Sequence, residues 1–257
     1  MRYVRVEFEG QLRDARLDHL GDDGELRVTL LRAPALHGGT VVGTSHTLRT
    51  EALRAPLSPG KIVCVGQNYR KHAAELGKPV PDEPLLFLKA TSSIVGPGGA
   101  IRCPPESELV HHEGELGVVI GTRMVDVPES EALRHVFGYV ATNDVTARDI
   151  QKREIQHTRA KSYDTFACCG PFMVRGLDFS DLQVTCRLNG EQKQVGRTSD
   201  MVHSPAKLVA FISNVMTLLP GDLISTGTPS GVGPMKDGDV VEVEIEGIGV
   251  LRNPVKR

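Results

Sequence analysis

The sequence predicts a β-rich α+β fold, and three observations support this prediction. Short runs that are apolar, or that alternate between apolar and polar residues, recur along the chain as they do in buried and half-buried strands. The chain contains 27 Gly and 16 Pro, many of which separate these runs as turn signals. Few segments show the helical spacing of apolar residues. With 257 residues, the chain is long enough for one large core or two smaller ones.

The first part of the chain has the pattern of a small β unit. Residues 3–10 (YVRVEFEG) and 24–31 (GELRVTLL) alternate apolar and polar residues between turn signals such as GDDG. Residues 54–61 (RAPLSPGK) are rich in Pro and polar residues, which is typical of a linker. We therefore expect a small N-terminal β domain over residues 1–56 and a larger domain over residues 57–257.

The larger part begins with a strand and a short helix and continues mainly as strands. Residues 62–65 form an apolar strand that reaches Gly66, and the helix after it stops at Gly77–Pro79. A polar region that permits helix covers residues 147–163. One clear helix begins after Ser204, an N-cap residue followed by Pro at the first helical position. The remaining predicted strands cover 85–90, 115–121, 138–149, 171–174, 184–190, 222–228 and 239–255.

Charge and composition exclude several classes of function. The net charge of −2 gives no electrostatic reason for binding nucleic acid or an anionic membrane. No apolar run approaches the roughly 20 residues of a membrane span. The first residues alternate charged and apolar side chains and so lack the apolar centre of a signal peptide, and we expect a cytoplasmic protein. The five cysteines show no metal-binding spacing, and each is interpreted as a small buried apolar residue.

Three carboxylates are the first candidates for chemistry. Glu113 and Glu115 are two residues apart in VHHEGELGVVIG, so in a strand they share one face, with Cα atoms roughly 6.6 Å apart. Two carboxylates at that separation repel each other unless a positive group lies between them or both stand in water. Asp144 ends the next strand-like run, and an all-oxygen set suits Mg²⁺, Mn²⁺ or Ca²⁺ better than zinc. The alternative is that the two glutamates face solvent on an edge strand.

Three further features are candidates for catalysis or binding. His72 and Glu75 are three residues apart on the short helix, so they form either a general base with its orienting carboxylate or an ordinary surface pair. Lys161 either faces an anionic group of the substrate or is a solvated surface charge. The Gly-rich segment 224–234 can offer backbone N–H groups and the Thr228 hydroxyl to an anion, but it lacks the phosphate-loop and dinucleotide spacings.

The order of these segments along the chain resembles the signature segments of the fumarylacetoacetate hydrolase family. The segments are VGQNYRKHAAELG, HHEGELGVVIG, GYVATNDVTARDIQ, AKSYDTFACCGPF and STGTPSGVGPM. The resemblance covers about Leu57 to the C-terminus, and the first residues are similar to the small N-terminal domain of many bacterial members. It implies a mixed β-sandwich roll that is usually assembled as a homodimer. Among the family's activities, the chain most resembles the bacterial 2-hydroxyhepta-2,4-diene-1,7-dioate isomerase and 5-carboxymethyl-2-oxo-hex-3-ene-1,7-dioate decarboxylase branch, and it is also similar to acylpyruvate hydrolases.

The resemblance also implies roles for individual residues. Glu113, Glu115 and Asp144 match the carboxylates that bind one Mg²⁺ or Mn²⁺, with Ca²⁺ as an alternative occupant. His72 and Glu75 match a His-x-x-Glu dyad on a lid helix, and Lys161 matches a catalytic lysine. The residues implied to contact substrate are Gln151, Lys161, Thr228, Asn68 and Tyr69.

The implied substrate is a small 2-oxo dicarboxylic or diketo acid of the kind produced in aromatic ring degradation. Hydrolysis, decarboxylation and isomerisation all stay open, because each can proceed through a pyruvate-like enolate stabilised by the metal and Lys161. Acylpyruvate hydrolysis and oxaloacetate decarboxylation are the alternative activities. Gln67 departs from the pattern, since relatives often carry Arg or Leu there, and it leaves the contact with the distal end of the substrate open. Two non-enzymatic alternatives are a metal-dependent binding protein without turnover and a structural β protein.

Overall fold

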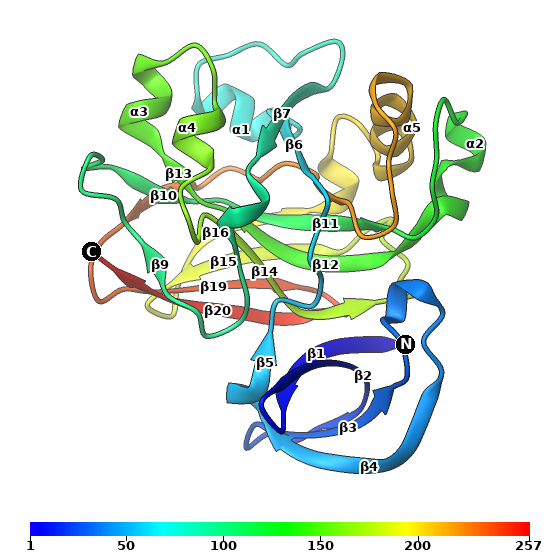
Figure 1. The fold of residues 1–257 in the computed structure, drawn as a ribbon. Coiled ribbons are helices and arrows are strands. Elements are labelled where there is room, and N and C mark those ends of the chain that lie inside the picture. The colour runs from blue at the N-terminus through cyan, green and yellow to red at the C-terminus, as the bar shows by residue number, and fades with distance from the viewer.

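The computed structural model describes all 257 residues, and strands dominate it (Figure 1). The largest sheet has 12 strands. They are β1 (Arg2–Phe8), β2 (Gln11–Leu20), β3 (Glu25–Leu31), β4 (Val41–Arg49), β5 (Leu53–Arg54), β6 (Ile62–Gly66), β7 (Leu85–Lys89), β8 (Ile94–Val95), β11 (Gly114–Ile120), β12 (Val136–Asp144), β14 (Ala167–Val174) and β17 (Leu223–Ser225). The order across the sheet is β4-β3-β2-β1-β14-β12-β11-β17-β6-β7, with β5 beside β1 and β8 beside β14.

Two smaller sheets complete the β structure. A five-stranded sheet contains β9 (Ile101–Arg102), β15 (Gln183–Leu188), β16 (Glu191–Arg197), β19 (Val240–Ile245) and β20 (Gly249–Lys256), in the order β16-β15-β19-β20-β9. It packs against β11, β12 and β14 of the large sheet. A three-stranded sheet has the order β13-β10-β18, made by β10 (Val110–His112), β13 (Thr146–Ala147) and β18 (Gly233–Met235). The predicted β-rich fold class with mixed sheets is confirmed.

The helices are short and lie outside the sheets. They are α1 (Arg70–Glu75), α2 (Glu129–Ala132), α3 (Arg148–Arg153), α4 (Thr158–Lys161) and α5 (Pro205–Val215), with 3-10 turns at Ala35–His37, Thr50–Ala52, Thr91–Ser93, Leu133–His135 and Thr198–Asp200. Helix α5 begins as predicted, because the Ser204 hydroxyl accepts a hydrogen bond of 3.1 Å from the backbone N–H of Lys207. Helices α1, α3 and α4 gather on one side of the large sheet (Figure 1). None of the helices has the length and apolar character that a membrane crossing requires.

The N-terminal strands continue the large sheet at one end. Strands β1 to β4 curl into a lobe below the rest of the molecule (Figure 1). Strand β1 runs antiparallel to β14 through the pairs Arg2↔Val174 and Tyr3↔Met173. The predicted boundary at residue 56 lies in the segment between β5 and β6.

Strand β11 is buried on both faces, which explains its continuous apolar sequence. Leu116 and Val118 face the larger core cluster, which includes residues of the five-stranded sheet, and Val119 belongs to a second cluster on the other face. Position 114 packs closely against the five-stranded sheet, because a Cβ there would come within 3.2 Å of the Cys186 Cβ and 3.3 Å of a Val243 methyl group. The side chains at 113 and 115 therefore point away from the five-stranded sheet, toward the side that carries α1, α3 and α4.

The predicted strand over 138–149 is shorter in the structure. Strand β12 ends at Asp144, and helix α3 begins at Arg148. The polar region over 147–163 forms two helices, α3 and α4. The residue that ends β12 is thus placed at the edge where the helices begin.

Candidate active site

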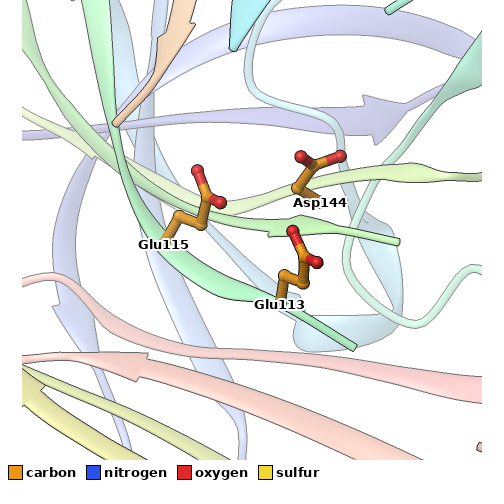
Figure 2. A group of neighbouring side chains, drawn as sticks. All are labelled: Glu113, Glu115 and Asp144. Carbon is orange, nitrogen blue, oxygen red and sulfur yellow. The ribbon is translucent and has the colours of Figure 1, made fainter. Parts of the chain in front are cut away.

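Antiparallel pairing of β11 with β12 brings the three predicted carboxylates together. Gly114 pairs with Asn143, and the backbone N–H of Asp144 donates to the Glu113 carbonyl at 2.9 Å, so Asp144 stands opposite Glu113 on the same sheet face. Figure 2 shows the three side chains pointing toward one another from these strands. One oxygen from each lies within 4.8 Å of the others, and all three residues are at most 4% exposed. The alternative of solvent-facing glutamates is therefore wrong.

Three cations neutralise two of these carboxylates. The Lys161 ammonium lies 2.7 Å from Glu113 Oε2 and 2.7 Å from Asp144 Oδ2. Lys89 pairs with the other oxygen of Asp144, and Arg148 pairs with the other oxygen of Glu113. Every oxygen of Glu113 and Asp144 thus has a cationic partner.

Burial and these ion pairs shift the pKa values in opposite directions. Burial acts to raise the pKa of Glu113, but the charges of Lys161 and Arg148 outweigh burial and hold that pKa well below its usual range. Burial acts to lower the pKa of Lys161, but Asp144 and Glu113 outweigh it and raise that pKa. Lys161 is therefore an ammonium and Glu113 a carboxylate at neutral pH.

Glu115 is the member of the cluster without a cation. Its Oε2 accepts hydrogen bonds from the Ser225 hydroxyl at 2.6 Å and from the backbone N–H of Gly227 at 2.8 Å, whereas Oε1 has no hydrogen-bond partner. Burial, and then the charges of Asp144 and Glu113, raise the pKa of Glu115 to about 8. The Oε1 oxygen of this buried carboxylate therefore has no positively charged group beside it.

The residues present fit a divalent cation on chemical grounds. Three buried carboxylates converge, their donor set is entirely oxygen, and Glu115 lacks a positive partner. Hard cations such as Mg²⁺ and Mn²⁺ prefer such ligands. Glu113, Glu115 and Asp144 would hold the ion.

A cavity of about 370 Å³ opens over this cluster. The predicted site residues that line it are His72, Glu113, Glu115, Asp144, Gln151, Lys161 and Thr228. Gln67 also lines it, with a φ of 57° that non-glycine residues adopt rarely and that recurs at functional sites. The structure therefore brings seven residues predicted from distant segments to one polar cavity.

The predicted dyad forms, and it connects helix α1 to the opposite loop. The Nδ1 atom of His72 lies 3.0 Å from Glu75 Oε2. Because a carboxylate only accepts, Nδ1 carries a hydrogen, and Nε2 is the nitrogen that accepts a proton in the neutral tautomer. The other oxygen of Glu75 accepts from the backbone N–H of Gly231 at 3.0 Å. A Cβ at position 231 would lie 2.0 Å from the Lys193 carbonyl oxygen, so only glycine fits there.

Asn68 and Tyr69, both predicted to contact substrate, do not line the cavity. The Asn68 amide nitrogen donates to the carbonyl groups of His203 and Thr226 at 3.0 and 2.8 Å, and its oxygen accepts from the His203 N–H at 2.8 Å. Tyr69 is 2% exposed and precedes α1 as its N-cap residue. In this structure both residues fix the approach to α1.

The Thr228 hydroxyl is already engaged within the protein. It donates to the Gly114 carbonyl at 2.9 Å and accepts from the Gln194 amide at 2.7 Å. Its single hydrogen is therefore used, whereas the backbone N–H of Thr228 has no partner in the protein. The N–H is the donor that this residue offers to the cavity.

Three residues that contact the carboxylates or the strand between them were not predicted from the sequence. Lys89 and Arg148 pair with the carboxylates, and Gln194 contacts the strand between the two glutamates. A signal existed for Lys89, which ends the otherwise apolar run LLFLK and is buried. No local pattern distinguishes Gln194 from the exposed polar residues before it.

Comparison with known proteins agrees with this geometry. A family model described as "Fumarylacetoacetate (FAA) hydrolase C-terminal" matches residues 61–256. The chain belongs to the fumarylacetoacetate hydrolase family. The predicted family is confirmed, and the match excludes the alternative of a purely structural β protein.

Solved structures of similar fumarylacetoacetate hydrolase-family proteins cover the whole chain. The chain is 41% identical to a 5-carboxymethyl-2-hydroxymuconate delta-isomerase from Mycobacterium smegmatis, with a TM-score of 0.92 and coverage of 100% of both chains. It is 42% identical to a 2-hydroxyhepta-2,4-diene-1,7-dioate isomerase from Mycobacterium marinum, with a TM-score of 0.91 and coverage of 100% of this chain and 98% of the other.

A human relative carries a different activity name. The chain is 44% identical over 214 residues to a human mitochondrial oxaloacetate tautomerase, covering 78% of this chain and 68% of the other. Hydrolases, isomerases and decarboxylases make up this family, and the chain is an enzyme of this kind. The prediction of an enzyme is confirmed.

Proposed function

We propose that this protein is a Mg²⁺- or Mn²⁺-dependent enzyme that transfers a proton at carbon 3 of a small 2-oxo dicarboxylic acid. The activity that fits best is isomerisation of the 2-hydroxyhepta-2,4-diene-1,7-dioate type, in the breakdown of aromatic compounds. One observation carries the proposal: His72, which pairs with Glu75, lines the same cavity as the three buried carboxylates. The isomerase and tautomerase names of the relatives support it, since both describe the movement of a proton.

A divalent ion held by Glu113, Glu115 and Asp144 would act as a Lewis acid that polarises the 2-oxo group of the substrate. The protein supplies the base. His72 is 4% exposed, and its free Nε2 is oriented by Glu75. In the proposed step Nε2 takes a proton, from the C3–H bond of a 2-oxo substrate or from the 2-hydroxyl group of a dienol substrate, and the electron pair of the broken bond moves into the enolate. In an isomerase the same proton then returns to a carbon other than the atom it left.

Three residues would stabilise and orient the enolate. Lys161 uses two of its three N–H groups on Glu113 and Asp144, so the third is free to donate within the cavity. The Gln151 oxygen accepts from Arg148 at 2.6 Å, which leaves the Gln151 amide N–H groups for the substrate. The backbone N–H of Thr228 provides a further donor. All three residues line the cavity in which negative charge would develop.

Cleavage of a C–C bond is the second candidate. Acylpyruvate hydrolysis and oxaloacetate decarboxylation release the same pyruvate-like enolate, and the same donors would stabilise it. The polar lining of the cavity favours a small polar substrate in both cases, since only four of its 17 lining residues are hydrophobic. Proton transfer is preferred because His72 lines the cavity together with the carboxylates and because the relatives are named as isomerases and a tautomerase.

Deuterium exchange tests the proposal directly. The EDTA-treated enzyme is reloaded with Mg²⁺ or Mn²⁺, and NMR in D₂O follows the C3 protons of 2-oxohexanedioate and oxaloacetate. We expect exchange well above the enzyme-free rate, and none in the presence of EDTA. A parallel assay follows the loss of the conjugated 2-hydroxyhepta-2,4-diene-1,7-dioate. Failure to exchange C3 protons of any 2-oxo acid, with acylpyruvate cleavage intact, would overturn proton transfer in favour of hydrolysis.

A further inference from the structure

Three basic residues of the cavity have no part in the chemistry above. Lys78, Lys152 and His157 all line it. The two lysines are exposed and the histidine is half-buried, whereas the three carboxylates are buried. These basic residues therefore lie toward the solvent end of the cavity, with the carboxylates at the inner end.

Each of the three is attached to a segment that also carries a proposed site residue. Lys78 follows α1, and its backbone N–H donates to the Ala73 carbonyl at 3.0 Å after Gly77 turns the chain with a φ of 64°. Lys152 lies on α3 beside Gln151. The His157 carbonyl accepts from the Lys161 N–H at 3.0 Å at the start of α4. These helices lie on the same side of the large sheet (Figure 1).

The charges at the two ends of the cavity differ. At the inner end Lys89, Arg148 and Lys161 all pair with Glu113 or Asp144, so each of these cations has a carboxylate partner in the protein. Neither Lys78 nor Lys152 takes part in any ion pair. The outer end therefore carries two positive charges without a protein counter-ion, and a divalent ion at the inner end would add to the excess.

His157 also lacks a partner in the protein. Its Nδ1 atom is buried and makes no hydrogen bond. The ring packs edge-on against Phe87, with centroids 5.6 Å apart and planes at 80°. Burial, and then the charges of Lys161 and Lys78, lower the pKa of His157. His157 lines the cavity, and no hydrogen bond to the protein holds its ring, so the ring is free to bind a polar ligand there.

We propose that Lys78, Lys152 and His157 form a distal subsite for the second carboxylate of the substrate. The proposal rests on the proposed function, because it assumes that a 2-oxo acid group occupies the inner end. The two ammonium groups neutralise the distal carboxylate, and His157 donates to it. The subsite selects 2-oxo dicarboxylates over 2-oxo acids with a neutral tail.

Two ligands that differ only at the distal end test the subsite. 2-Oxohexanedioate and 2-oxohexanoate share the 2-oxo acid group and chain length, and only the former has a second carboxylate. Oxalate reports on the inner end alone. Calorimetric titration of the Mg²⁺-loaded enzyme measures the affinity for each ligand. The experiment is done at about 0.15 M salt, because this ionic strength screens charges that lie more than roughly 8 Å from the ligand. Calorimetry is suitable because the chain has no Trp to report binding by fluorescence.

The wild-type enzyme is expected to bind 2-oxohexanedioate about tenfold more tightly than 2-oxohexanoate. This is the difference expected from two charge-assisted contacts that are partly exposed to water. The double substitution Lys78→Gln and Lys152→Gln should bring this ratio close to one. His157→Phe, which keeps the apolar contact with Phe87, should lower it about threefold. Arg153→Gln is the matched control, since Arg153 follows Lys152 on α3, is exposed and does not line the cavity.

The outcomes separate the two proposals. Absence of oxalate binding to the Mg²⁺-loaded wild type would overturn the proposed function itself. If oxalate binds but the dioate-to-monoacid ratio is near one, or survives the double substitution, the distal subsite is wrong. An equal loss of affinity for all three ligands in the double variant would also overturn the distal subsite. It would show that the two lysines attract every anion at long range and do not contact the second carboxylate.

Discussion

The Gln194 side chain donates a 2.7 Å hydrogen bond to the Thr228 hydroxyl and also donates to the Pro229 carbonyl at 2.7 Å. Its oxygen accepts from the Gly114 N–H and from His112 Nδ1, each at 3.0 Å. Gln194 is 1% exposed, and these four bonds use its hydrogen-bonding capacity fully. One amide on β16 thus joins the strand between the two glutamates to the loop that carries Thr228.

Replacing Gln194 by Leu should weaken the site as well as the fold. The change removes all four bonds and leaves buried groups such as the Gly114 N–H without a partner, at a cost of about 1–3 kcal/mol each. We expect a lower melting temperature and, at a temperature where the variant is fully folded, a Mg²⁺ affinity reduced roughly tenfold because the strand between the glutamates is no longer fixed. Gln192→Leu, an exposed position on the same strand, is the control. A folded Gln194→Leu enzyme with unchanged Mg²⁺ affinity would limit Gln194 to stability.

Glu115→Gln should abolish both turnover and the rise in melting temperature that Mg²⁺ causes. The substitution keeps the size of the side chain but removes the one carboxylate that has no cation beside it, so the ion loses a charged ligand. Differential scanning fluorimetry with and without Mg²⁺ measures the effect. Glu51→Gln, at an exposed position, should behave as the wild type. Wild-type activity of the Glu115 variant after EDTA treatment and Mg²⁺ addition would show that the metal site is misassigned.

The metal-free protein should lose stability as the pH rises from about 4.5 to about 8. The pKa of Glu115 is raised from 4.5 to about 8 in the folded protein, first by burial, so the folded state binds more protons than the unfolded state in this range. The stabilisation is complete below the lower value and is lost as the pH passes the higher one. Melting curves in EDTA at a series of pH values measure this, and Glu115→Gln should flatten the decline. Because Mg²⁺ displaces the proton, its binding at pH 7 should release protons into a weakly buffered solution. A Mg²⁺ affinity that does not change between pH 6 and pH 8 contradicts this prediction.

His72→Gln should lower kcat by roughly 10²–10⁴, the usual contribution of a general base, while Mg²⁺ still raises the melting temperature. Gln keeps a polar side chain beside Glu75 but cannot accept and carry the proton. Steady-state kinetics and C3 exchange in D₂O measure the loss on the same substrate. Lys71→Gln, exposed on the same helix, is the control. An unchanged kcat for the His72 variant would remove the dyad from the mechanism.

Local patterns predicted most of the elements and the residues that meet at the site. The apolar run of β11, the N-cap Ser204 and the spacing of His72 and Glu75 are visible within short windows of sequence. Glu113, Glu115 and Asp144 were predicted as one cluster, and the register of β11 with β12 provides the contact. The ordered family segments added the residues from distant parts of the chain, including Lys161.

The contacts that hold the site could not be predicted in the same way. Gln194 reaches Gly114 across 80 positions of sequence, and no local pattern encodes such a contact. The roles expected of Asn68 and of the Thr228 hydroxyl illustrate a second limit. A polar side chain shows which bonds it can make, but only the surrounding backbone shows that those bonds are already made within the protein.

The two oxygens of Glu75 have a consequence for the timing of the reaction. One oxygen orients His72, and the other accepts from the backbone N–H of Gly231 in the loop that faces α1. Movement of α1 away from that loop would break the second bond and release the carboxylate that aligns the base. With such a movement, proton abstraction in the proposed reaction would begin only once the site has closed over the substrate. The same linkage would protect the product, because the base would lose its alignment as the site opens.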